Sequence, residues 1–106
     1  MKEIEEIIDN INKYTEHIFE GGFNEGTTLK KIAESIQKIY MEFITIIPSL
    51  NDMGMNINRE IIVGQIRNIT DSIKRKDTVL LFDTLRYEIL DTLKFYNEIK
   101  NIMEQE

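Results

Sequence analysis

Apolar side chains recur at alternating steps of three and four residues along residues 77–103, and this spacing predicts one long amphipathic helix. The stripe that we expect to face the core consists of Phe82, Leu85, Ile89, Thr92, Tyr96, Ile99 and Met103. At about 100° per residue, a second apolar group projects more than about 90° away from the centre of that stripe. This group consists of Val79, Leu80, Tyr87 and Leu90. The first half of the helix is therefore predicted to be wrapped by other helices or by a second molecule.

Three earlier segments, at about residues 2–19, 27–48 and 58–76, show the same helical period. Their apolar stripes are Ile4, Ile7, Ile8, Ile11, Tyr14 and Ile18 in the first, Leu29, Ile32, Ile36, Ile39, Phe43, Ile46 and Leu50 in the second, and Ile62, Ile66, Ile69 and Ile73 in the third. Pro48 disfavours helical geometry in the residue before it, so we expect the second helix to end there. Gly64 weakens the interior of the third helix and is interpreted as a close approach of a neighbouring helix.

Turn-forming residues separate the four segments. Glycines in residues 21–26 favour the end of the first helix and a turn after it. Residues 51–54 combine side chains that bond their own backbone with a glycine, and Asn58 and Asp77 are suited to begin the last two helices. Short connections place successive helices antiparallel and adjacent. The sequence therefore predicts an all-α fold, an antiparallel up-down four-helix bundle, with residues 1–106 forming a single domain.

The balance of residue types is that of a soluble globular protein, with 42% hydrophobic and 30% charged residues. A net charge of −6 would repel phosphate groups, which argues against nucleic acid as a partner. The first residues lack the basic start and apolar run of a signal peptide, and no stretch reaches the roughly 18 apolar residues that cross a bilayer. Since the chain contains no cysteine, it has no disulfide framework. We expect a cytoplasmic protein that binds neither nucleic acid nor membrane.

Residues suited to catalysis or metal binding are scarce. His17 is the only histidine, and it projects away from the apolar stripe of its helix, so we expect it at the surface. A di-iron site in a bundle needs Glu-x-x-His pairs on two helices, and zinc needs several cysteines or histidines. The surroundings of Ser35, Ser49 and Ser72 do not resemble a nucleophile elbow. We therefore predict no enzymatic activity, no cofactor and no metal.

Charged side chains on the last helix allow two interpretations. Asp83 with Tyr87, and Glu88 with Asp91, lie about one turn apart. In the first interpretation they form a solvated surface, where Arg86 pairs with Asp83 and Lys94 pairs with Asp91. In the second they rim a protein interface. That predicted interface consists of Val79, Leu80, Asp83, Tyr87, Glu88, Leu90 and Asp91.

The stretch KRKDTVLLFDTLRYEILDTL resembles the motif that opens the last helix in a family of small all-helical proteins of Gram-positive bacteria. The matching residues are Asp77, Leu80, Leu81, Asp83, Leu85, Tyr87, Glu88 and Leu90. Residues 24–36 resemble an earlier helix of that family more weakly. This sequence differs at Thr78, where the family has an aromatic residue, and at Asp91, where a proline is common. The resemblance implies a helical fold and no established activity.

Two functions from different classes follow as hypotheses. The first is a non-enzymatic interaction module that self-associates or binds an amphipathic helix of a partner protein through the last helix. Small acidic bundles that escort exported subunits belong to this class, so a chaperone-like or adaptor-like role follows by analogy. The alternative is a small-ligand sensor with a pocket in the bundle core, which Met41, Met53, Met55 and Met103 could line. If the other helices enclose the last helix completely, its second apolar face needs no partner.

Overall fold

The computed structural model describes residues 2–20 and 26–104, and within these ranges it contains helices, turns and bends but no strand. The helices in chain order are α1 (Lys2–Glu16), the short 3-10 helix η1 (Ile18–Glu20), α2 (Gly26–Asp52), α3 (Arg59–Arg75), α4 (Thr78–Asp83), the π-helical segment η3 (Thr84–Ile89) and α5 (Leu90–Glu104). The last three are parts of one continuous helix. Of the turn predicted at residues 21–26, residues 21–25 lie outside the described residues.

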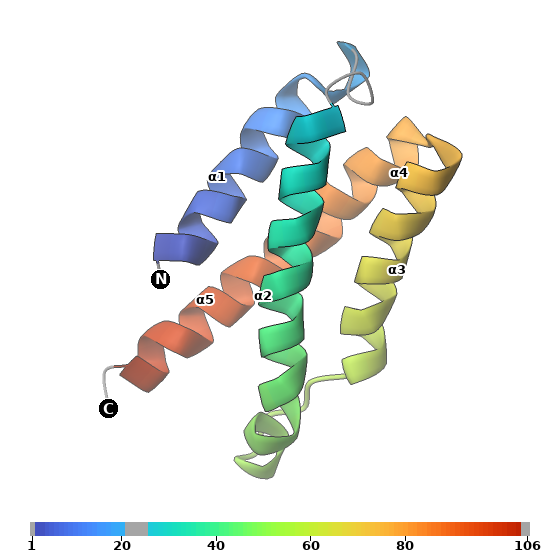
Figure 1. Cartoon of the computed structure of the whole chain (residues 1–106). Coiled ribbons are helices and arrows are strands. Elements are labelled where there is room, and N and C mark those ends of the chain that lie inside the picture. The colour runs from blue at the N-terminus through green and yellow to red at the C-terminus, as the bar shows by residue number, and fades with distance from the viewer. Residues whose placement is uncertain (1, 21–25, 105–106) are drawn as a thin grey trace.

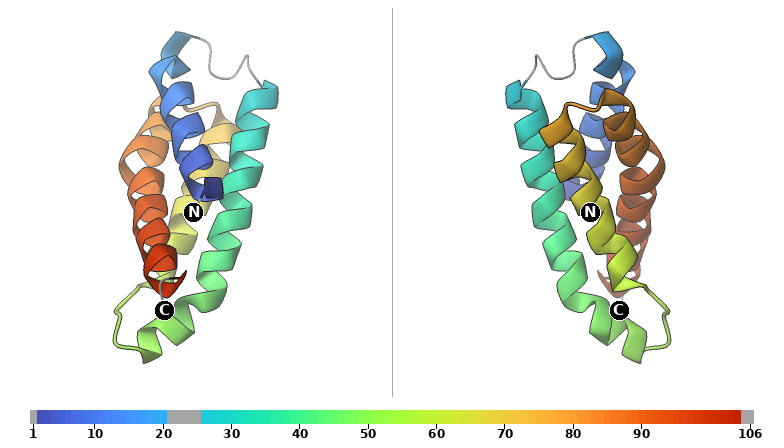
Figure 2. Two further views of the ribbon diagram at one scale, coloured as in Figure 1. Left: turned by 90° about the vertical axis from the view of Figure 1, so that its left-hand side faces the viewer. Right: turned by 90° about the vertical axis from the view of Figure 1, so that its right-hand side faces the viewer.

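The helices run alternately up and down, so the predicted all-α four-helix bundle is confirmed (Figure 1). Helix α2 packs against α1 and α3. The last helix packs against the same two helices on the side of the bundle opposite α2. Its first part, α4, contacts α3, whereas α5 contacts α1 (Figure 2). The last helix therefore crosses the bundle obliquely, and its middle part, η3, contacts both α1 and α3.

One continuous apolar core joins all four helices. Its largest fully buried side chains are Tyr40 and Phe43 of α2. The Phe43 ring stacks on Tyr96 of α5 with 4.6 Å between ring centroids and meets the edge of Phe95 at 6.2 Å. Because Phe43 touches both rings, it links α2 to α5 across the bundle.

The amino-terminal caps follow the sequence prediction. The Asn58 side-chain oxygen accepts a hydrogen bond from the Glu60 N–H at 2.9 Å, and that of Asp77 accepts one from the Leu80 N–H at 3.0 Å. Both bonds satisfy a backbone donor that has no partner inside its helix. Lys76 adopts a left-handed conformation at the end of α3, with φ of 53°, so that α4 begins after a tight turn.

The prediction that Pro48 ends the second helix is wrong, because α2 continues to Asp52. A proline removes one backbone donor from a helix, but here the following turn is stabilised from two sides. Leu50 is buried in the core, and the Asn51 side chain exchanges two hydrogen bonds with the Ile57 backbone, at 2.8 and 3.0 Å. Figure 2 shows α2 bending at this end. The burial of Leu50 and the loop bonds of Asn51 therefore outweigh the local preference of proline.

The interpretation of Gly64 as a site of close helix packing is also wrong. A Cβ atom built at Gly64 meets no other atom within 4 Å. We therefore expect Gly64→Ala to raise the free energy of unfolding by about 0.5–1 kcal/mol, because alanine loses less backbone freedom in a helix. The matched control is Gly54→Ala, since Gly54 has a φ of 103° that alanine adopts only with strain. Urea denaturation of both variants tests this, and a loss of stability in Gly64→Ala would contradict it.

Candidate functional site

The last helix contains a widened π-helical turn where the sequence predicts a continuous α-helix. In η3 the N–H of Leu90 donates to the carbonyl oxygen of Leu85, five residues earlier, instead of four as in an α-helix. The turn thus holds one residue more than an α-helical turn does. Thr84, at its start, is fully buried, and its hydroxyl oxygen has no hydrogen-bond partner among the described residues. An unsatisfied buried hydroxyl lowers the free energy of unfolding by about 1–3 kcal/mol. The π turn therefore contains a polar group that destabilises the fold.

The π turn determines which side chains share a face. In an α-helix, residues four apart drift by about 40°, because about 3.6 residues complete one turn. In a wider turn the rotation about the helix axis from one residue to the next is smaller, so residues four apart drift by less than about 40°. Side chains at four-residue spacing therefore stay aligned through η3. The buried line is Leu81, Leu85, Ile89 and Leu93, and the exposed line is Val79, Asp83, Tyr87 and Asp91.

Most, but not all, residues of the predicted interface lie at the surface. Val79 and Tyr87 are 60% and 64% exposed, and Asp83 and Asp91 are exposed as well. Leu80 and Glu88 are half-buried.

The assignment of Leu90 to the outer face is wrong, because it is 3% exposed and belongs to the core. The additional residue in the π turn rotates Leu90 inward.

Three contacting rings, from η1, α4 and η3, form a partly exposed aromatic patch, which we define as Phe19, Phe82 and Tyr87. The Phe82 ring lies 5.3 Å from Phe19 and 6.1 Å from Tyr87, measured between ring centroids. In an α-helix, Phe82 and Tyr87 would point about 140° apart, so it is the π turn that brings them together. Phe82, predicted to face the core, is half-buried and packs against it, whereas its neighbour Leu81 is fully buried.

Phe19 is 62% exposed and was not assigned to the interface from the sequence. Phe19 does not belong to the apolar stripe of the first helix, and an apolar residue off the stripe could have indicated an exposed position.

Two carboxylates flank Tyr87 along the exposed line. Among the described residues, neither Asp83 nor Asp91 takes part in an ion pair. The sequence offered Arg86 as a partner for Asp83, but Arg86 instead donates to the Thr15 hydroxyl of α1 at 3.1 Å. Lys94 likewise forms no ion pair with Asp91. The acidic flank of the patch, which we define as Asp83 and Asp91, is therefore not neutralised by these two cations.

A buried polar network ties the last helix to α2 and α3. The Tyr40 and Thr92 hydroxyls both donate to the Gln65 side-chain oxygen, at 2.6 and 2.8 Å, and all three residues are buried. Thr92 lies in the predicted core stripe, but this network was not predicted from the sequence. Burial raises the pKa of Tyr40 above its ordinary value, and the neighbouring Thr92 hydroxyl opposes that effect only in part. Since the network satisfies its hydroxyls, it fixes the register of the three helices beside the π turn.

We expect Tyr40→Phe to lower the free energy of unfolding by about 1 kcal/mol near neutral pH, because one hydrogen bond is lost. The unfolded chain releases the Tyr40 proton near its ordinary pKa of 10.0, whereas the folded chain retains it to higher pH. Raising the pH above that value therefore favours unfolding of the wild type. Urea midpoints at about pH 9 and about pH 11 test this, because the alkaline loss should be smaller in Tyr40→Phe. Equal losses in both proteins would contradict the assignment.

The described residues contain neither a group of metal ligands nor a helix that could span a membrane. His17 is exposed, as predicted, and its Nδ1 lies 3.1 Å from a carboxylate oxygen of Glu20. Within residues 2–20 and 26–104, no three histidine, cysteine or acidic side chains are grouped so that they could hold a metal ion. None of the helices in that part of the chain has the length and apolar character to span a bilayer.

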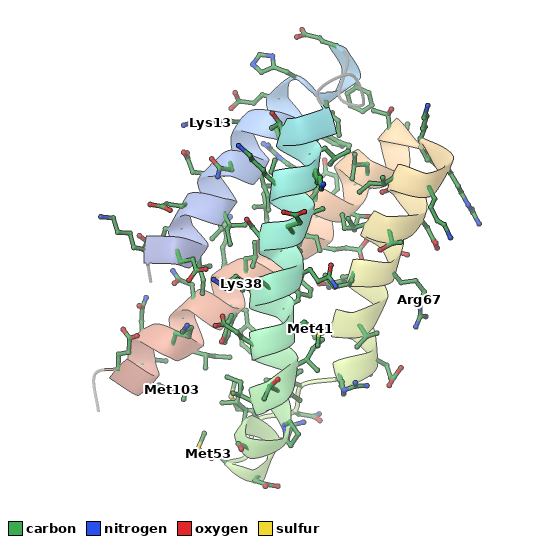
Figure 3. All side chains as sticks on the ribbon, in the orientation of Figure 1. Lys13, Lys38, Met41, Met53, Arg67 and Met103 are labelled. Carbon is green, nitrogen blue, oxygen red and sulfur yellow. The ribbon has the colours of Figure 1, made fainter. Side chains whose placement is uncertain are left out.

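Surface grooves beside α2 are potential ligand sites. One of about 400 Å³ lies between α1 and α2 and is lined in part by Lys13 and Lys31. Another, of about 390 Å³, lies between α2 and the end of α3. Neither groove is lined by a methionine. Met41, Met53 and Met103 are exposed, as Figure 3 illustrates, and Met55 is half-buried. A ligand sensor with a pocket in the core thus stays a prediction without support from the methionines.

Comparison with known proteins found no match to a family model, to a curated protein or to a solved structure. The resemblance of the last helix to a Gram-positive helical family therefore stays a prediction.

Proposed function

We propose that the chain is a non-enzymatic protein-interaction module that receives an amphipathic helix of another protein on the aromatic patch. The observation that carries this proposal is a row of three contacting rings, Phe19, Phe82 and Tyr87, whose two outer members are more than half exposed. Contiguous exposed apolar surface on a soluble protein is typical of interaction sites, and aromatic side chains dominate binding hot spots. The π turn supports the same proposal, because such turns are frequent at functional sites.

Charge favours a different protein over a second copy of this chain. Each chain carries a net charge of −6, and Asp83 and Asp91 flank the patch. In a symmetric dimer the same surface of both copies meets, so these carboxylates would face each other. Like charges brought together at an interface are unfavourable. A partner helix of different composition avoids this repulsion. The proposed class includes adaptor-like and chaperone-like proteins.

The proposal is tested by Tyr87→Ser, with Met41→Ser as the matched control. Both side chains are exposed, at 64% and 57%, but Met41 lies on α2, away from the patch. We expect Tyr87→Ser to reduce capture of a partner at least about tenfold, as for a moderate hot spot, and Met41→Ser to leave it unchanged. Quantitative mass spectrometry of proteins captured by the three chains measures this.

Both variants should retain their urea midpoint, because exposed substitutions rarely alter stability by more than about 0.5 kcal/mol. Light scattering should give the mass of one chain, 12.5 kDa. Equal capture by both variants, or a dimer that dissociates in Tyr87→Ser, would contradict the proposal.

A further inference from the structure

The positions of the two flanking carboxylates define the chemistry of the partner helix. Asp83, Tyr87 and Asp91 lie on one exposed line at four-residue spacing, with the aromatic residue in the middle. Eight residues of α-helix span roughly 12 Å, but the additional residue of the π turn shortens the separation of the two carboxylates along the helix axis to roughly 10 Å. A binding surface with an apolar centre and one anion on each side selects a ligand with the complementary order.

We infer that the partner is a basic amphipathic helix, with an apolar anchor between two lysine or arginine residues that lie about eight positions apart. These positions are roughly 12 Å apart in an α-helix, and the long side chains of lysine and arginine cover the small difference in span. This inference rests on the proposed function and names the partner class for the same site. The apolar anchor packs on the aromatic patch, while the two cations reach Asp83 and Asp91. Helices bind to grooves and faces in this manner through side chains on one face.

The nearby cations do not already serve the two carboxylates. Arg86 donates to Thr15 of α1, and Lys94 forms no ion pair among the described residues. Glu88, half-buried on the neighbouring face, adds to the negative potential at Tyr87. Phosphate-bearing and acidic partners are repelled by this surface. Exposed ion pairs contribute little to affinity, so the acidic flank provides selectivity while the aromatic patch provides most of the binding free energy.

Selection from a displayed library of helical peptides tests this inference on the full chain. The central positions of the library are apolar, and the positions four residues to either side are randomised. We expect lysine and arginine to be enriched over aspartate and glutamate at both randomised positions. Binding of the selected peptides should fall about five- to tenfold in the double variant Asp83→Asn, Asp91→Asn, and the difference should shrink at high salt. The control is Glu42→Gln, Asp52→Asn, which removes two exposed carboxylates of α2.

The outcomes separate this inference from the proposed function. Selected peptides that depend on Tyr87 but carry no basic preference overturn the basic partner and leave the interaction surface in place. Equal weakening by the two double variants also overturns the basic partner, because it indicates an effect of net charge alone. Peptides that bind independently of Tyr87, or the absence of any binding peptide, overturn both.

Discussion

Replacing Phe43 with alanine is expected to lower the free energy of unfolding by about 3–5 kcal/mol, the usual cost of removing a buried aromatic ring. The Phe43 ring is fully buried and stacks on Tyr96 at 4.6 Å between centroids. Its loss leaves a cavity between α2 and α5. Since small domains are stable by only about 5–15 kcal/mol, a large part of the total would be lost. Urea denaturation monitored by circular dichroism measures the change.

Phe95→Ala serves as the control for Phe43→Ala. Phe95 belongs to the same aromatic cluster, at 6.2 Å from Phe43, but is exposed. Its removal is expected to cost about 1 kcal/mol, because less surface returns to water and no closed cavity forms. Equal losses in the two variants would show that Phe43 is not the link between α2 and α5.

Deleting Tyr87 is expected to convert the π turn into a regular α-helix and to abolish partner binding without unfolding the chain. The buried residues on either side, Leu85 and Ile89, would then be three positions apart instead of four. This restores the alternation of three-residue and four-residue steps that the buried stripe of an α-helix follows. The flanking helices keep their places because the π turn holds one residue more than the α-helical turn that replaces it. We expect a loss of affinity of at least about 30-fold, since a hot-spot side chain disappears. Nuclear magnetic resonance assignment of the helix and binding of a selected peptide measure the two effects.

Deletion of Lys94 is the matched control for the Tyr87 deletion. Lys94 is exposed and lies in the regular α-helix α5. Removing it rotates every later residue by about 100°, so that Tyr96 and Ile99 leave the core. We expect this chain to unfold or to lose most of its stability. If both deletions unfold the chain, the π turn is a structural necessity and not an added residue that presents Tyr87.

The helical spacing of apolar residues was sufficient to predict the fold, because each stripe repeats over several turns. The caps at Asn58 and Asp77 were also predictable, since a cap depends on a side chain and the backbone two or three residues later. The end of α2 was not predictable. It depends on the hydrogen bonds that Asn51 forms with Ile57, six residues later, and on the burial of Leu50 in the core, and neither follows from the proline or from the helical period.

The candidate site was predicted in part for the same physical reason. Val79 and Tyr87 were identified because they project away from the expected stripe, and both are exposed. Leu90 was misplaced because helical periodicity assumes a constant rotation per residue, whereas η3 rotates less. The contribution of Phe19 comes from a different helix, so no pattern within residues 77–103 could reveal it.

Site-specific photo-crosslinking tests the proposed contact surface most directly. A photoreactive phenylalanine analogue replaces Tyr87 in one chain and Met41 in another, both exposed positions on different helices. We predict that position 87 crosslinks to one helical segment of another protein and that position 41 does not. Crosslinks of equal yield from both positions, or crosslinks from position 87 only to a second copy of this chain, would contradict the aromatic patch as the site that binds another protein.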